Sequence, residues 1–153
     1  MAEHSVTAAG SHAAFTASGT NVWAIVVLLG RILFSLVFIL ASINHFNGSD
    51  TAYAIQSGLP MAKLLVPASG ALALLGGLSI LIGYHAKIGA WLIVLFLVGV
   101  TPVMHNFWAV KDPMMHAMQQ VNFMKNVSML GGALLITQFG AGPMSVDAGR
   151  GSR

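Results

Sequence analysis

The chain contains no cysteine and few charged residues. Of its 153 residues, seven are Lys or Arg and four are Asp or Glu, so that 7% are charged, whereas soluble domains are typically about 25% charged. The absence of cysteine excludes disulfides, thiolate nucleophiles, cysteine zinc sites and Cys-ligated iron–sulfur clusters. The scarcity of charge excludes an ordinary soluble domain, a disordered chain and a nucleic-acid-binding protein, because a net charge of +3 forms no basic patch.

Common motifs of soluble enzymes are also missing. The sequence has no Gly-x-Gly-x-x-Gly, no phosphate-binding glycine loop, no Ser-His-Asp arrangement and no pair of neighbouring carboxylates. Hydrolase and nucleotide chemistry of the soluble type is therefore not expected.

Apolar residues, in contrast, make up 56% of the chain, and the mean hydropathy is +0.80. They gather in four stretches, each near the ~20 residues that a helix needs to cross a bilayer. Backbone polar groups in lipid must be satisfied within the segment, so the stretches predict helices. They cover residues 22–43, 64–82, 88–104 and 122–139. We therefore predict an all-α integral membrane protein, an antiparallel bundle of four transmembrane helices in contact with membrane lipid.

Three segments follow from this pattern. They are residues 1–21 as a mobile N-terminal tail, residues 22–139 as the four-helix transmembrane domain and residues 140–153 as a C-terminal tail. The first segment contains no Lys or Arg and so lacks the basic start of a secretory signal.

The connections carry helix and turn signals. Residues 51–57 predict a short helix that ends at Gly58 and Pro60. Asp112 followed by Pro113 is typical of a helix start. The residues after it that share one helical face are Met114, Met118, Val121 and Lys125. This spacing predicts an amphipathic segment at the membrane interface that leads into the fourth helix.

Small residues recur along the second stretch. Ser69, Ala73 and Gly77 follow one another at intervals of four residues, which places them on one helical face. Membrane helices pack closely through such small residues, although Gly and Ala are also generally frequent in these helices. We predict that these three residues form a helix-packing seam.

Polar side chains in the first stretch share one stripe. Arg31, Ser35, Ser42 and His45 lie within a narrow sector of the helix. An Arg inside a membrane span costs roughly 2.5–3.5 kcal/mol on insertion scales. We therefore expect the stripe to face the bundle interior, the alternative being that Arg31 extends to the lipid headgroups.

Helix connectivity predicts where further polar residues meet. In an up-down-up-down bundle, the ends of the first and third helices and the start of the fourth lie on the same side. Arg31 is expected to reach towards this rim from within the bundle. The predicted ligand-binding residues are Arg31, His45, His105, Trp108, Lys125 and Asn126. Imidazoles and cations can hydrogen-bond a quinone oxygen and move its proton, while the alternative is that these residues only bond one another and the loops.

Metal and haem sites are weaker interpretations of the same residues. Methionines and histidines around residues 104–118 offer ligands for Cu(I), but methionine also fills gaps in membrane helices. Haem between His45 and His105 lacks a Cys-x-x-Cys-His attachment motif. We predict no metal site. The sequence does not identify a cofactor, and it favours quinone over haem or copper.

Several motifs together resemble the DoxX family of small membrane proteins. They occur in this order: Gly30-Arg31-Ile32-Leu33-Phe34-Ser35, Asn44-His45-Phe46, Gly58-Leu59-Pro60, Gly76-Gly77-Leu78-Ser79, His105-Asn106-Phe107-Trp108, Phe123-Met124-Lys125-Asn126, Leu130-Gly131-Gly132 and Gly140-Ala141-Gly142-Pro143, ending at Asp147. The similarity covers residues 24–147. It implies four membrane helices, both termini in the cytoplasm, a link to quinone-reducing complexes and the same six site residues.

These observations lead to one hypothesis and two alternatives. The hypothesis is a DoxX-like subunit of a quinone-linked oxidoreductase or respiratory complex in the bacterial inner (cytoplasmic) membrane, not catalytic alone. The alternatives are a structural or assembly subunit of a larger membrane complex and a small transporter. Partners would be a larger complex or further copies of the chain, and no nucleic acid. Charge does not decide the orientation, because Lys and Arg divide three against three between the two sides.

Overall fold

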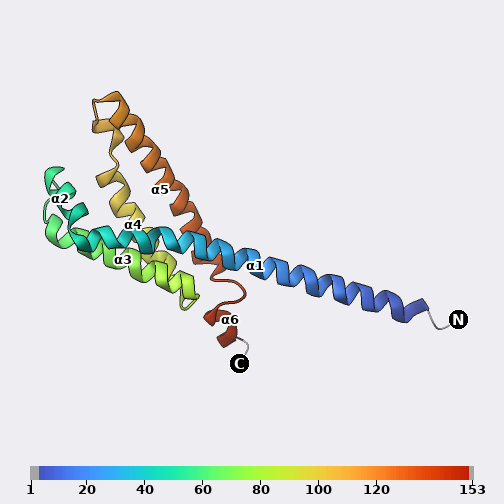
Figure 1. Ribbon diagram of the computed structural model, residues 1–153. Coiled ribbons are helices and arrows are strands. Elements are labelled where there is room, and N and C mark those ends of the chain that lie inside the picture. Colours follow the sequence, from blue (N-terminus) through green and yellow to red (C-terminus); the bar gives the residue numbers. More distant parts are fainter. Residues whose placement is uncertain (1–3, 152–153) are drawn as a thin grey trace.

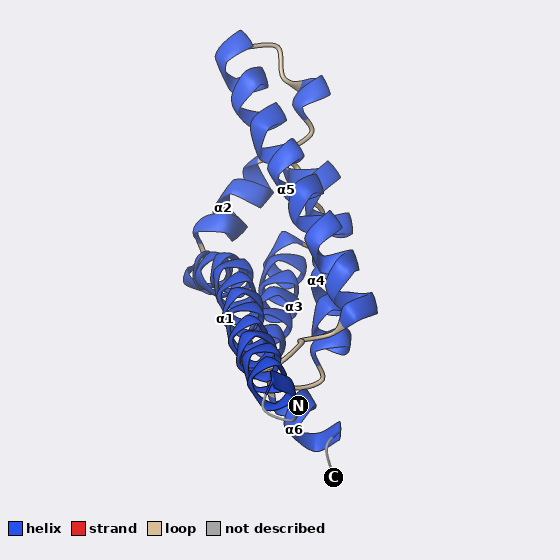
Figure 2. Cartoon of the chain, turned by 90° about the vertical axis from the view of Figure 1, so that its right-hand side faces the viewer, coloured by secondary structure: helices blue, strands red, loops and turns tan. Residues whose placement is uncertain are grey.

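The computed structural model describes the backbone of residues 4–151 and the side chains of residues 22–150, and this part of the chain is entirely helical apart from its connections (Figure 2). Six α-helices and one 3-10 helix follow one another. They are α1 (His4–Asn47), α2 (Ser49–Gln56), α3 (Ala62–Ile82), α4 (Ala86–Met104), the 3-10 helix η1 (Phe107–Ala109), α5 (Pro113–Phe139) and α6 (Val146–Gly151).

Three segments of the described chain are long and apolar enough to cross a membrane. They are Val22–Asn47, Ala62–Ile82 and Ala86–Ala109. Leucines on their outer faces, such as Leu33 and Leu95, are 60–68% exposed, as lipid contact requires. The chain is thus an all-helical membrane protein. A fourth span along α5 remains a prediction, because glutamines, asparagines and Lys125 lower the hydropathy of its first half.

Turn and cap residues set the helix boundaries. Gly48, at φ 90°, separates α1 from α2, and Gly83, at φ 72°, ends α3. The Asp112 side chain accepts a hydrogen bond from the Met115 N–H at 2.8 Å, with Pro113 as the first helical residue. The predicted helix start is therefore confirmed. The predicted interfacial segment and the predicted fourth stretch form one unbroken helix, α5.

Small residues bring α3 close to both neighbours. A Cβ at Gly76 would lie 2.8 Å from the Gly89 carbonyl oxygen in α4, and one at Gly77 would lie 3.0 Å from Ile39 Cγ1 in α1. Ala73 is fully buried in the main core cluster, whereas Ser69 is half-buried and donates to the Val66 carbonyl at 2.8 Å. The backbones of α3 and its neighbours therefore approach through glycines.

The backbones of the four long helices pack in a row, and α5 also meets α1 through side chains of the shared core, where Phe34 lies against Gly132. α1 lies along α3, α3 along α4, and α4 along α5. The first half of α5 runs beside the end of α4 and diverges from α1 and α3, while α2 lies across the gap (Figures 1 and 2). The antiparallel bundle of four transmembrane helices remains a prediction, as does the division into two tails and one transmembrane domain. α1 begins at His4, within the predicted N-terminal tail.

Candidate binding cavity

A cavity of about 840 Å³ lies between the end of α1, α2, α3, the second half of α4 and the first half of α5. Its volume is in the range of small-molecule sites, about 300–1,000 Å³. Most of its wall is apolar, with Phe38, Leu72 and Phe96 at its inner end. The polar side chains in its lining are His45, Asp50, Ser69, Tyr53, His105, Gln119, Lys125 and Asn126. The cavity therefore has an apolar part and a polar part.

His45 is held at the end of α1 by contacts on two sides. Its Nδ1 lies 3.1 Å from the Ala41 carbonyl oxygen and 3.1 Å from Asp50 Oδ2. Both partners accept, so Nδ1 carries the proton and donates. A Cβ at Gly70 of α3 would lie only 2.5 Å from His45 Cβ, and the ring packs 5.8 Å from Phe96. Close packing of α1 on α3 therefore fixes this imidazole.

A chain of hydrogen bonds joins three helices at the polar part of the cavity. His105 Nδ1 lies 2.8 Å from Gln119 Oε1, and Gln119 Nε2 donates to the Tyr53 hydroxyl at 3.2 Å. The amide oxygen can only accept, so His105 donates from Nδ1. Nε2 of His105 is then an acceptor in the neutral ring, and the Tyr53 hydroxyl keeps its own proton to donate. These bonds hold α2, α4 and α5 at fixed positions around the cavity.

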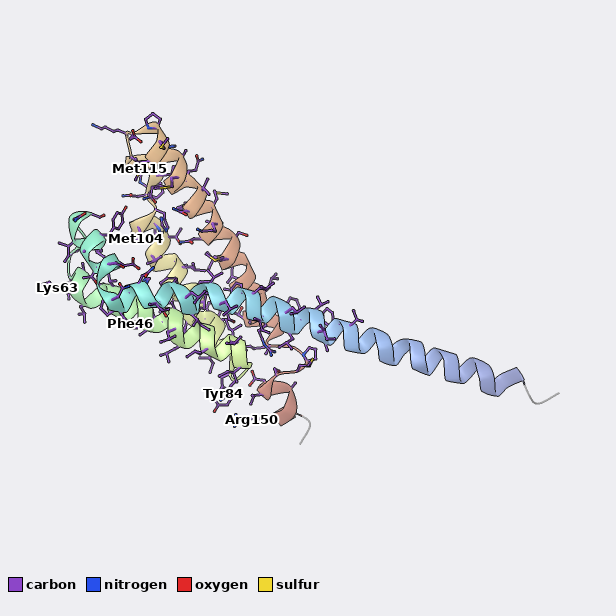
Figure 3. The ribbon with its side chains drawn as sticks, in the orientation of Figure 1. Phe46, Lys63, Tyr84, Met104, Met115 and Arg150 are labelled. Carbon is purple, nitrogen blue, oxygen red and sulfur yellow. The ribbon has the colours of Figure 1, made fainter. Side chains whose placement is uncertain are left out.

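α5 contributes two further polar residues and much of the remaining wall. Asn126 is 7% exposed, whereas Lys125 is exposed and donates to Asn122 Oδ1 at 3.1 Å. Four methionines also line the cavity, and two of them, Met104 and Met115, lie where α4 ends and α5 begins (Figure 3). Unbranched, polarisable methionine side chains adapt to ligands of different shape.

Arg31 does not reach this site, and the expectation that it would is wrong. The residue is 6% exposed, which confirms that it faces the interior, but it lies at the opposite end of the helix row. Its Nε donates to the Leu81 carbonyl at 3.2 Å, Nη1 to Ala141 at 2.9 Å and Nη2 to Met144 at 2.8 Å. Helical side chains lean towards the N-terminus, which for Arg31 is away from the cavity.

Trp108 is not brought to the cavity either. It is 60% exposed in η1, and its ring packs 5.8 Å from Phe123 and 5.2 Å from Phe107. Of the six predicted ligand-binding residues, the structure brings His45, His105, Lys125 and Asn126 to one cavity. That they bind a ligand remains a prediction.

The sequence analysis missed a second polar arrangement, at the far end. Asp147 accepts hydrogen bonds from the His85 N–H at 2.9 Å and the Ala86 N–H at 3.0 Å, and so caps α4. Desolvation raises the pKa of this carboxyl, but the two backbone bonds and the nearby His85 and Arg150 outweigh it, so the pKa lies below its ordinary value. Tyr84 and Arg150 meet at this end, remote from Met104 and Met115 (Figure 3). No local sequence signal shows this cap, because Asp147 lies 62 and 61 residues after the two residues that it caps.

The fold and the cavity define the class of protein: a helical membrane protein with a partly polar cavity between its helices. Residues 2–151 match the SURF4 family, and the chain belongs to that family. No solved structure matches the chain. No group of three His, Cys, Asp or Glu side chains that could hold a metal lies within the described residues.

Two relatives show how far the similarity extends. Inner membrane protein YphA of Escherichia coli is 26% identical over 125 residues, which are 80% of this chain and 89% of YphA. ER-derived vesicles protein ERV29 of Saccharomyces cerevisiae is 27% identical over 116 residues, which are 71% of this chain but only 37% of ERV29. The chain thus spans most of the bacterial relative and about a third of the yeast one.

The family result overturns the resemblance to DoxX proteins. The chain is a SURF4 protein, so the DoxX interpretation is wrong, and so is the hypothesis of a quinone-linked oxidoreductase or respiratory subunit that rested on it. Two of the quoted motifs contain glycine pairs within apolar helices, Gly76-Gly77 and Gly131-Gly132, and such pairs do not distinguish one membrane family from another. Close helix packing in lipid requires such pairs in unrelated membrane proteins.

Proposed function

We propose that the chain is a receptor-type membrane protein, which binds a client molecule reversibly in the cavity and does not transform it. The observation that carries this proposal is the cavity of about 840 Å³, with apolar walls from several helices and hydrogen-bonding groups in one part. Such a combination is typical of sites that bind and orient an amphiphilic ligand. His45, His105, Lys125 and Asn126 form its polar part.

The relatives favour a carrier role over a redox role. ERV29 is named as a protein of ER-derived vesicles, so one relative of this chain is associated with membrane vesicles. YphA is named as an inner membrane protein and is similar along most of its length, which supports the same location for this chain. We propose that the client is cargo that stays with the membrane while it is bound.

The methionines in the lining support reversible binding of varied clients. Met104, Met115, Met118 and Met129 line the cavity from two helices. Flexible thioether side chains repack at low cost, and they are frequent at surfaces that bind several partners.

The finer architecture belongs to the same proposal. We propose that α5 is the fourth membrane helix, with its first half at the interface, because Gln119, Lys125 and Asn126 face the cavity instead of lipid. An even number of spans would place both termini on one side, for which we propose the cytoplasm.

Site-directed photo-crosslinking in intact membranes tests the proposed function. A crosslinking amino acid replaces Met118, which lines the cavity, and in a control replaces Val121, which is 67% exposed on the same helix outside the lining. We expect a discrete client adduct from position 118 and only diffuse lipid labelling from position 121. Identical products from the two positions, or no discrete product from position 118, would contradict a client-binding cavity.

A further inference from the structure

We propose that the part of the client that enters the cavity is a single acyl chain joined to an uncharged, hydroxyl-bearing head. The inference rests on the proposed function and names the chemical class of the ligand. The lining runs along α4 from Leu95 to His105, about 15 Å at the rise of a helix. The cavity is therefore long enough to hold a stretch of extended hydrocarbon chain, and most of its polar groups lie towards one end.

Asn126 is the residue that most directly indicates a polar ligand group. Its side chain is 7% exposed and lines the cavity, yet its amide forms no hydrogen bond within the described part of the chain. Neither the oxygen nor the nitrogen of this amide is completely enclosed by protein, so both can be reached from the cavity. Leaving such an amide unpaired in an apolar site is costly. A ligand carbonyl or hydroxyl at this position would satisfy it.

His105 and Tyr53 offer matching groups nearer the end of α4. The hydrogen bonds to Gln119 occupy His105 Nδ1 and the acceptor side of the Tyr53 hydroxyl. His105 Nε2 and the Tyr53 proton are then available, one to accept and one to donate. A hydroxyl-bearing head offers both a donor and an acceptor to these groups, whereas a simple hydrocarbon offers neither.

Charge in the lining favours an uncharged head. The ionisable carboxylate, Asp50, lies 3.1 Å from His45, and the ammonium of Lys125 is exposed and bonded to Asn122. Each of these charged groups already has a hydrogen-bonding partner, so neither is a free counter-ion for a charged head. Burying an unpaired charge costs far more than burying a hydroxyl that is hydrogen-bonded.

The size and lining of the cavity disfavour other occupants. An α-helix, about 10–12 Å across, would fill 840 Å³ with only about two turns. An extended peptide carries an N–H and a C=O at every residue, and the apolar wall offers them few partners. A phospholipid with two long chains and its headgroup exceeds the volume.

Photolabelling of the full chain in phosphatidylcholine nanodiscs tests this inference. The probe is a monoacylglycerol with a diazirine near the end of its acyl chain, and peptide mass spectrometry locates the labels. We expect labels on cavity-lining residues such as Leu72 and Met129. Unlabelled monoacylglycerol should compete, while oleate and octadecane at the same mole fraction should not. Equal competition by octadecane, or equal labelling of lipid-facing leucines, would overturn the inference.

Two variants of α5 separate the polar contact from general packing. Asn126→Leu keeps the side-chain size and should lower labelling about tenfold, the effect of losing one buried hydrogen bond. Gln120→Leu replaces an exposed amide side chain on the same helix, outside the lining, and should retain wild-type labelling. Undiminished labelling of Asn126→Leu would contradict the proposed head contact.

The same experiments distinguish failure of this inference from failure of the proposed function. A discrete protein-sized adduct from the crosslinker at position 118, without any labelling by the monoacylglycerol, would refute the acyl ligand. The same result would still support a cavity that binds a client. If position 118 gave no discrete adduct at all, both the acyl ligand and the client-binding function would be refuted.

Discussion

Arg31 and Asp147 hold the segment before α6 against the ends of α3 and α4. Arg31 donates to three carbonyls, two of which belong to residues 141 and 144. Asp147 caps α4, and its own N–H donates to the Gly83 carbonyl at 2.8 Å. Part of the predicted C-terminal tail is therefore docked on the helices. Single residues thus fix a contact between positions up to 113 apart in the sequence.

Two opposing contributions to stability at Arg31 lead to a prediction about its replacement by Met or Lys. Arg31→Met removes three hydrogen bonds from a charged donor, each of which stabilises the protein by about 1.5–3 kcal/mol. It also removes the cost of placing a charged side chain inside the membrane, roughly 2.5–3.5 kcal/mol. Arg31→Lys keeps that cost and lacks the planar fork that reaches three divergent carbonyls. We expect Arg31→Lys to lower the midpoint of thermal unfolding more than Arg31→Met. Arg150→Lys, an exposed control, should change it little, and the reverse order of the two Arg31 variants would refute this account.

Asp147 gives the docked segment a pH dependence of known sign. Its pKa is lowered in the folded protein, so its contribution to docking is complete above the unfolded value, about 3.9, and is lost as the pH falls through the folded value. A spin label on a cysteine at Ala148 should be immobile at pH 7 and become mobile below about pH 4. With Asp147→Asn, the label should be more mobile at pH 7 and lose this transition. A transition unchanged by the substitution would assign it to another group.

At the scale of elements, hydropathy predicted the three apolar spans closely. The stretches at 64–82 and 88–104 correspond to α3 and α4, which begin two residues earlier in each case. The short helix expected at 51–57 is α2, two residues earlier at its start. α5 was predictable from Asp112 and Pro113, since the cap and the proline act locally. These elements follow from local sequence, because each signal lies within the element that it predicts or directly beside it.

The contact between α3 and α4 depends on Gly76. A Cβ there would lie 2.8 Å from a backbone oxygen of Gly89, which cannot move without the helix. Gly76→Leu should therefore separate the two helices and lower the free energy of unfolding by about 1–3 kcal/mol, the usual cost of overpacking a core. Gly131→Leu is the matched control, because a Cβ at Gly131 has no neighbour within 4 Å. Equal thermal unfolding of the two variants would contradict this role.

At the scale of the whole molecule, the alternation of helix directions predicted which residues meet. His45, His105, Lys125 and Asn126 come from three helices and line one cavity, as expected for residues on one side of an antiparallel arrangement. The row of helices and the position of Arg31 were not predictable. Both depend on carbonyls and packing contacts between segments far apart in the sequence, which no local pattern encodes.

Filling the cavity is the most direct test that it binds a client. Gly99 lines the cavity, and a Cβ there has no neighbour within 4 Å, so Gly99→Phe should occupy part of the cavity and obstruct it without disturbing the backbone. Gly131→Phe is the control, since it adds the same ring outside the lining. With the crosslinker at position 118, we predict that Gly99→Phe abolishes the client adduct and that Gly131→Phe preserves it. An adduct of full yield in a folded Gly99→Phe protein would contradict a client-binding cavity.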